Sequence, residues 1–124
     1  MPEFPPTPFK PVCVMSEARR LREGDGLTFD VVVDNVPRAA FAVRYKGKPY
    51  GFINMCPHQW LPLDFGDAHF FDDEYDAIVC CNHGGRFTPE TGECVAGPPL
   101  GGHLTRLTME ERDGELWCVG VARE

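Results

Sequence analysis

The sequence predicts an all-β protein, an antiparallel sandwich or barrel, built as one domain. Its 124 residues suffice for one core, because a chain of this size buries about two-thirds of its unfolded surface. The 13 glycines and 12 prolines are typical of a loop-rich β protein and unfavourable for long helices. A strong local signal is Asp113-Gly114 between two alternating segments, because an Asp-Gly pair in that position favours a tight hairpin.

The expected elements follow one another with turn signals between them. Residues 1–11 hold five prolines and predict an extended N-terminal arm, so the folded domain covers residues 12–124. Ser16 is a candidate cap for a helical turn that runs to about Arg22. We expect strands at residues 12–15, 28–33, 39–45, 49–55, 77–79, 86–88, 94–95, 104–110 and 116–121. Among these, the hairpin turned at residues 46–48 leads directly into the first of two motifs that carry chemistry.

These motifs are two short boxes, Cys56-Pro57-His58 and Cys80-Cys81-Asn82-His83, with 21 residues between them. Each box offers one thiolate and one imidazole. Thiolates favour ferric iron, whereas neutral imidazoles leave an iron cluster easier to reduce. Cys-x-His followed by Cys-x-x-His is the ligand pattern of a [2Fe–2S] centre in which two histidines replace two cysteines on one iron. Cys81 is an alternative ligand to Cys80, but the spacing to His83 favours Cys80.

From residue 56 to about residue 102 the chain resembles the Rieske ferredoxin family. Gly84 matches the glycine after the last ligand histidine, and Phe87 matches an aromatic residue further on. Residues 91–94 match the turn that follows, and residues 97–99 match the proline loop that covers the cluster in that family.

The resemblance implies the fold, the cofactor and its ligands. The expected fold is a Rieske-type antiparallel β-sandwich with a small cluster-binding subdomain, about residues 54–99, inserted between outer strands. The expected cofactor is one Rieske-type [2Fe–2S] cluster. Its ligands would be Cys56, His58, Cys80 and His83.

Three departures from the family pattern matter. The spacer is a few residues longer than usual. Leu61 and Asn82 stand where the Rieske proteins of cytochrome bc complexes carry two disulfide-forming cysteines. Gly85 and Phe87 replace a serine and a tyrosine whose hydroxyls hydrogen-bond to sulfur in those high-potential proteins. The loss of these donors predicts a midpoint potential at the low end of the Rieske range, about −150 mV.

A structural zinc site is the alternative by ligand count, because two cysteines and two histidines also suit tetrahedral zinc. Zinc fingers usually pair cysteine with cysteine and histidine with histidine at each knuckle. The mixed boxes therefore favour iron and sulfide over zinc.

The other cysteines and histidines and Trp117 are expected to be structural, whereas Trp60 either shields the cluster or packs in the core. The four non-ligand cysteines would be free thiols in a reducing cytosol. Cys94 would pack as a small apolar residue, and His69 and His103 would be surface or hydrogen-bonded histidines. The core would also hold Cys13, Cys118 and Trp117. The acidic residues within 64–76 either steer a partner or form a solvated loop pinned down by phenylalanines, and we favour the second interpretation.

Charge and the absence of recognisable signals limit the partners and the location. The net charge of −7 disfavours nucleic acid and anionic membrane surfaces and suits a basic patch on a redox partner. No stretch approaches the roughly 18 apolar residues that span a bilayer. Arg19-Arg20 is not followed by an apolar segment, so an export signal is not indicated and we expect a cytoplasmic protein.

The function implied by the resemblance is that of a ferredoxin component of a multicomponent oxygenase. Such a carrier takes single electrons from a flavin reductase and passes them to a terminal oxygenase. A mononuclear iron oxygenase site needs two histidines and a carboxylate, and only His69 and His103 remain once the cluster is ligated. The alternatives are a small Rieske-like subunit of an oxidoreductase such as nitrite reductase, and a zinc-binding structural module.

Overall fold

The computed structural model of the chain describes residues 11–55, 62–63, 69–71, 77–80, 84–97 and 102–122. Within them lie nine strands and one short 3-10 turn, η1 (Ala18–Arg20). The strands are β1 (Val12–Met15), β2 (Gly26–Val33), β3 (Val36–Tyr45), β4 (Lys48–Ile53), β5 (Ile78–Val79), β6 (Arg86–Phe87), β7 (Cys94–Ala96), β8 (Arg106–Arg112) and β9 (Glu115–Val121). Every strand pairing is antiparallel, which confirms the predicted all-β class. The expected arm lies almost wholly outside the described residues.

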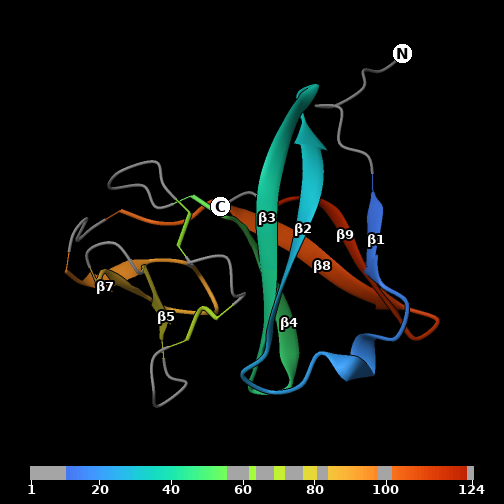
Figure 1. Cartoon of the computed structure of the whole chain (residues 1–124), viewed down its shortest axis with the longest axis horizontal. Coiled ribbons are helices and arrows are strands. Elements are labelled where there is room, and N and C mark those ends of the chain that lie inside the picture. Colours follow the sequence, from blue (N-terminus) through green and yellow to red (C-terminus); the bar gives the residue numbers. More distant parts are fainter. Residues whose placement is uncertain are drawn as a thin grey trace.

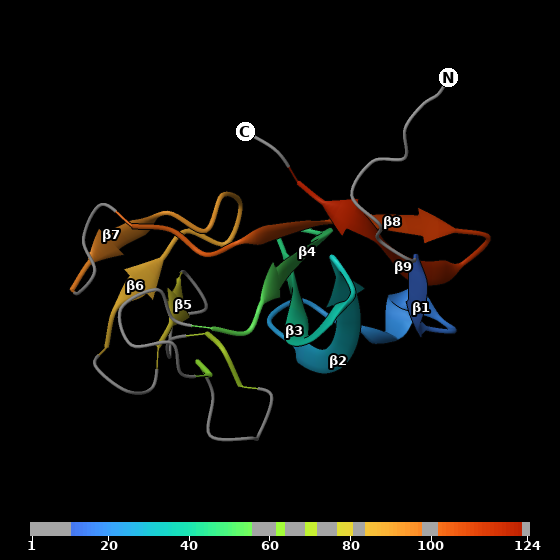
Figure 2. The same ribbon diagram turned by 90° about the horizontal axis from the view of Figure 1, so that it is seen from above.

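The strands form two sheets, and the two views in Figure 1 and Figure 2 show the smaller sheet beside the larger one. The larger sheet has the order β1-β9-β8-β4-β3-β2, and the smaller has the order β5-β6-β7. The larger sheet is strongly curved, which brings apolar residues from its two edge strands, β1 and β2, to one buried cluster. That cluster contains Val12 and Val14 from β1 together with Val31 from β2.

Three tight turns set the register of the larger sheet. Lys46-Gly47 and Asp113-Gly114 both have positive φ at their two central residues, as two-residue hairpin turns require. The sequence predicted both of these hairpins. It did not predict the β2–β3 hairpin, which turns at Asp34-Asn35 with φ values of 52° and 66°. Asp and Asn tolerate this left-handed conformation better than most residues, so the signal was present in the sequence.

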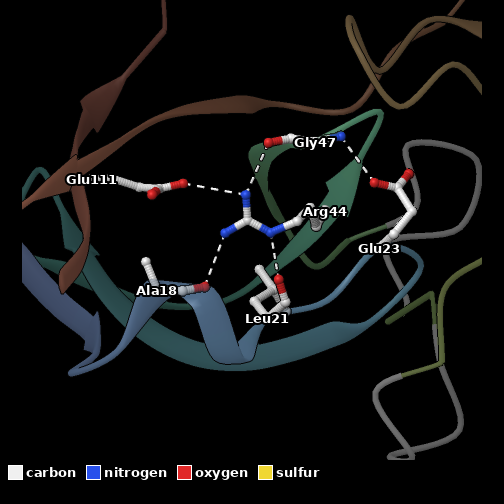
Figure 3. Close-up of polar contacts among 6 residues, drawn as sticks. All are labelled: Ala18, Leu21, Glu23, Arg44, Gly47 and Glu111. Atoms are coloured by element: carbon white, nitrogen blue, oxygen red, sulfur yellow. Dashed lines mark hydrogen bonds and ion pairs between the residues drawn. The ribbon is translucent and has the colours of Figure 1, made fainter. Parts of the chain in front are cut away.

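Arg44 joins η1 to the larger sheet (Figure 3). Its side chain is only 12% exposed, and its guanidinium donates to three backbone carbonyls and one carboxylate. The acceptors are Leu21 O, Ala18 O at 2.9 Å, Gly47 O at 3.0 Å and Glu111 Oε2 at 3.2 Å. The expected cap by Ser16 was wrong: Glu17 occupies the N-cap position without a side-chain bond, and the turn is only three residues long. Backbone carbonyls of this turn are instead bound by Arg44.

Two core predictions were wrong for one geometric reason. Cys13 is exposed, and Trp117 is only partly buried, with its Nε1 donating to Glu115 at 3.0 Å. Cys13 pairs directly with Trp117 across β1 and β9, and directly opposed residues point to the same face of a sheet. That face is the outer one, whereas the next residue, Cys118, points inward and is fully buried as predicted.

No helix in the part of the chain that the structure describes is long and apolar enough to cross a membrane.

Candidate metal centre

The second box lies in the loop between β5 and β6, where Cys80 is the first loop residue. Its N–H donates to Gly85 O, and its carbonyl accepts from Gly84 N–H, both at 2.9 Å. These bonds close the loop directly after the pairs Ile78–Phe87 and Val79–Arg86. Cys80 is 1% exposed, so its thiol stands at the junction between the loop and the core.

The segment that leaves β7 is pressed against this loop. Gly97 has a φ of +70°, and a Cβ built there would lie 3.2 Å from Gly85 Cα and 3.3 Å from Gly84 O. The Cys94 thiol donates to the carbonyls of Ala96 at 3.4 Å and Gly97 at 3.5 Å, which holds this turn in place. Cys94 is 2% exposed, so the prediction that it packs as a buried small residue is confirmed. Gly97, the first residue of the predicted proline loop, therefore lies against the two glycines that directly follow the second box.

The first box begins where β4 leaves the larger sheet. Ile53 N–H still donates to Thr105 O, and Asn54 N–H donates to Ala39 O, both at 2.9 Å. Beyond the box, Leu63 N–H donates to the side-chain Oδ1 of Asn54 at 2.8 Å. Sequence reasoning did not single out Asn54, although its place two residues before Cys56 was visible.

A single buried cluster joins the smaller sheet to the larger one and includes residues that flank the first box and open the second. Leu63 comes from the chain after the first box, and Cys80 opens the second. Both belong to the cluster that also contains Phe87 of β6 and Phe52 of β4. The other buried members are Phe41, Val43, Phe70, Phe71, Ile78, Cys94 and Leu104. Because close-packed interiors deform little, this cluster holds the bases of the two boxes in a fixed relation.

The long spacer is anchored by its aromatic residues. Phe70 and Phe71 are 2% and 3% exposed, and the Phe70 ring stacks on Phe41 with centroids 3.9 Å apart. Val79 N–H donates to Phe70 O at 2.8 Å, and Phe71 forms a bridge with Ile78. The expected pinning by phenylalanines is confirmed for these two residues. The acidic residues at 64, 67, 72–74 and 76 lie outside the described residues, so their role stays a prediction.

The structure describes one of the four predicted ligands, Cys80, and places it in the buried cluster that joins the two sheets. The other three, Cys56, His58 and His83, lie outside the described residues, as do Cys81 and Trp60. Cys13, Cys94 and Cys118 are free thiols, as expected. The two remaining histidines were expected to be surface or hydrogen-bonded residues, and both His69 and His103 are exposed.

The described residues thus form a small all-β protein with a buried cysteine at the base of a hairpin loop and a glycine turn packed against that loop. The chain belongs to the Rieske [2Fe-2S] domain family, whose model matches residues 10–117. Its cofactor is therefore a Rieske-type [2Fe–2S] cluster. Cys80 fits this group, because its sulfur lies where the loop leaves the core. Family membership also sets the zinc alternative aside.

Solved structures with the same fold include both ferredoxins and oxygenases. The ferredoxin of carbazole 1,9a-dioxygenase from Nocardioides aromaticivorans IC177 is 27% identical, with a TM-score of 0.66 over 92% of this chain and 98% of that chain. A chain in the complex of reduced oxygenase and oxidized ferredoxin in carbazole 1,9a-dioxygenase is 23% identical, with a TM-score of 0.70 over 92% and 96%. The terminal oxygenase of carbazole 1,9a-dioxygenase from Novosphingobium sp. KA1 is 15% identical, with a TM-score of 0.72 over 94% of this chain and 30% of that chain. No curated protein sequence matches this chain.

Proposed function

We propose that this protein is an electron carrier that passes single electrons from a flavin reductase to a terminal oxygenase. The observation that carries the proposal is the overlap with a ferredoxin chain at 27% identity, which extends over 92% of this chain and 98% of that one. The oxygenase match, in contrast, extends over only 30% of the oxygenase chain. The region in common with that oxygenase is thus a minor part of it, whereas a whole ferredoxin corresponds to this chain.

We further propose that Cys56, His58, Cys80 and His83 ligate the cluster. The support is the mixed pair of donors in each box and the buried position of Cys80 within the cluster that joins the two sheets. When bound, the cluster supplies a one-electron redox couple. The chain itself holds the bases of both boxes on one packed cluster, which limits rearrangement when the charge of the site changes.

The partners follow from charge and from the comparisons. A net charge of −7 favours encounter with a basic surface on the partner, because complementary charges speed association. One similar structure is described as a complex of reduced oxygenase and oxidized ferredoxin. We infer that an oxygenase accepts the electron here as well and that the protein does no bond-making chemistry by itself. The cytoplasmic location stays a prediction, which cell fractionation would check.

Anaerobic purification followed by metal analysis tests the carrier. We expect two irons and two acid-labile sulfides per chain, a Rieske visible spectrum, and rapid reduction of this spectrum by a flavin reductase. Colourless protein with zinc and no sulfide would overturn the proposal. Tight co-purification with a large flavoprotein would favour the alternative of an oxidoreductase subunit.

Cysteine variants test the ligand assignment. We expect Cys80→Ala to lose the visible spectrum, together with His58→Ala and His83→Ala. Cys13→Ala is the matched control, because this thiol is exposed on β1. A Cys80→Ala protein with an unaltered spectrum would contradict the assignment of Cys80 as a ligand. If Cys81→Ala alone lost its colour, Cys81 would be the ligand instead.

A further inference from the structure

Asn54 stands out because it is the one polar or charged side chain that is buried among the residues the structure describes. It is 9% exposed and follows directly after β4. Buried polar side chains normally have a hydrogen-bonding task, since burial without a partner is unfavourable. The task of Asn54 is visible in two bonds on opposite sides of the residue.

The two bonds tie both ends of the first box to the fold. Asn54 N–H donates to Ala39 O at 2.9 Å, which fixes Asn54 to β3. Its side-chain Oδ1 accepts from Leu63 N–H at 2.8 Å, across nine positions of sequence. Cys56 and His58 lie between these two ends of the chain. The side chain therefore closes the loop that carries the first box, at a point where β4 has already ended.

The Leu63 end of this clamp is itself fixed in the core. Leu63 is fully buried in the same cluster as Cys80 and Phe87. The Asn54–Leu63 bond thus relates the loop of the first box to the base of the second through packed side chains.

We propose that Asn54 is a positioning residue for the cluster: by holding Leu63 it keeps the first pair of ligands in register with the second. This inference rests on the proposed ligand set. Asn54 acts through the loop, without being a ligand itself. Partners that orient metal ligands typically change metal affinity 10- to 100-fold when removed, so the effect should be measurable.

Three variants test the clamp in the cluster-loaded protein. Asn54→Ala removes the acceptor, and Asn54→Asp retains an acceptor oxygen. Ile53→Ala is the matched control, because Ile53 is a neighbouring buried residue (8% exposed) that packs in a different cluster. The probes are the rate of bleaching by excess ferrous chelator, the rate of amide hydrogen exchange in the peptide that contains Leu63, and the unfolding midpoint in urea.

We expect Asn54→Ala to bleach about tenfold faster and to exchange the Leu63 amide at least tenfold faster. Asn54→Asp should bleach more slowly than Asn54→Ala, and Ile53→Ala should lower the urea midpoint without accelerating either rate comparably. The inference would be overturned if Asn54→Ala bleached at the wild-type rate, or at the same rate as Ile53→Ala once the two variants are compared at matched stability. Either result would leave the proposed electron-carrier function intact. Wild-type protein that takes up no [2Fe–2S] cluster would overturn the proposed function first, and the inference with it.

Discussion

Replacing Gly97 by alanine tests whether the turn after β7 is held against the second box by close backbone contact. Two costs arise from the structure. A side chain at φ +70° costs about 1–2 kcal/mol relative to glycine. The new Cβ would also lie 3.2 Å from Gly85 Cα and 3.3 Å from Gly84 O, and overpacking of this kind costs typically about 1–3 kcal/mol. We therefore expect Gly97→Ala to lower the free energy of unfolding by about 2–5 kcal/mol.

Gly114→Ala separates the two costs. Gly114 has a similar φ of +82°, but a Cβ there meets nothing within 4 Å, so only the conformational cost of about 1–2 kcal/mol applies. Urea unfolding of both variants, each with a full transition and a fitted m-value, gives the difference. Gly97→Ala should also change the EPR spectrum of the cluster, because Gly84 and Gly85 adjoin the predicted ligand His83. Equal losses of stability in the two variants, with unchanged EPR spectra, would refute the contact.

Four further results are expected. Gly92→Ala should lower the melting temperature more than Gly114→Ala, because a Cβ there would lie 2.9 Å from a buried ring atom at a φ of +79°. Arg44→Lys should cost about 2 kcal/mol in urea unfolding, because an ammonium cannot reproduce the guanidinium fork that reaches several carbonyls. Burial raises the pKa of the Cys118 thiol from 9.0 to about 11, so the folded state holds this proton more tightly than the unfolded state does. The free energy of unfolding should therefore keep its full value below pH 9 and fall as the pH rises towards 11, and Cys118→Ala should reduce this fall. Protein-film voltammetry should give a midpoint near −150 mV, because neither Gly85 nor the buried ring of Phe87 has a side-chain hydrogen-bond donor; a value well above zero would contradict this.

Local patterns predicted the strands and most turns of this protein. Asp113-Gly114 and Lys46-Gly47 carry the turn chemistry that two-residue hairpins need, and both hairpins formed where expected. The ladder of β5, β6 and β7 around the second box also followed the predicted segments. Of the four predicted ligands, the structure describes Cys80 alone, so the ligand set stays a proposal.

The errors concern contacts between distant segments. Composition cannot tell which face of a strand points inward, and Cys13 on β1 and Trp117 on β9 lie together on the outer face of the sheet. Arg44 was not recognised as a link to η1, because the two carbonyls that it binds there, Ala18 O and Leu21 O, lie more than 20 residues away in the sequence. Asn54 was missed because its partner is a backbone N–H nine residues away, and every residue type except proline offers such a donor.

The adjacency of β4 and β8 has a consequence for how such proteins vary in length. The chain leaves the larger sheet at Ile53 and returns at Thr105, and these two residues share a hydrogen bond of 2.9 Å. A long connection whose two ends are neighbours can gain residues at a small entropic cost, roughly 0.6 kcal/mol for each doubling of the loop length. Extra residues in the spacer would therefore leave the closure of the curved sheet undisturbed, so that the surface around the cluster could be remodelled for a new partner while the frame remains constant.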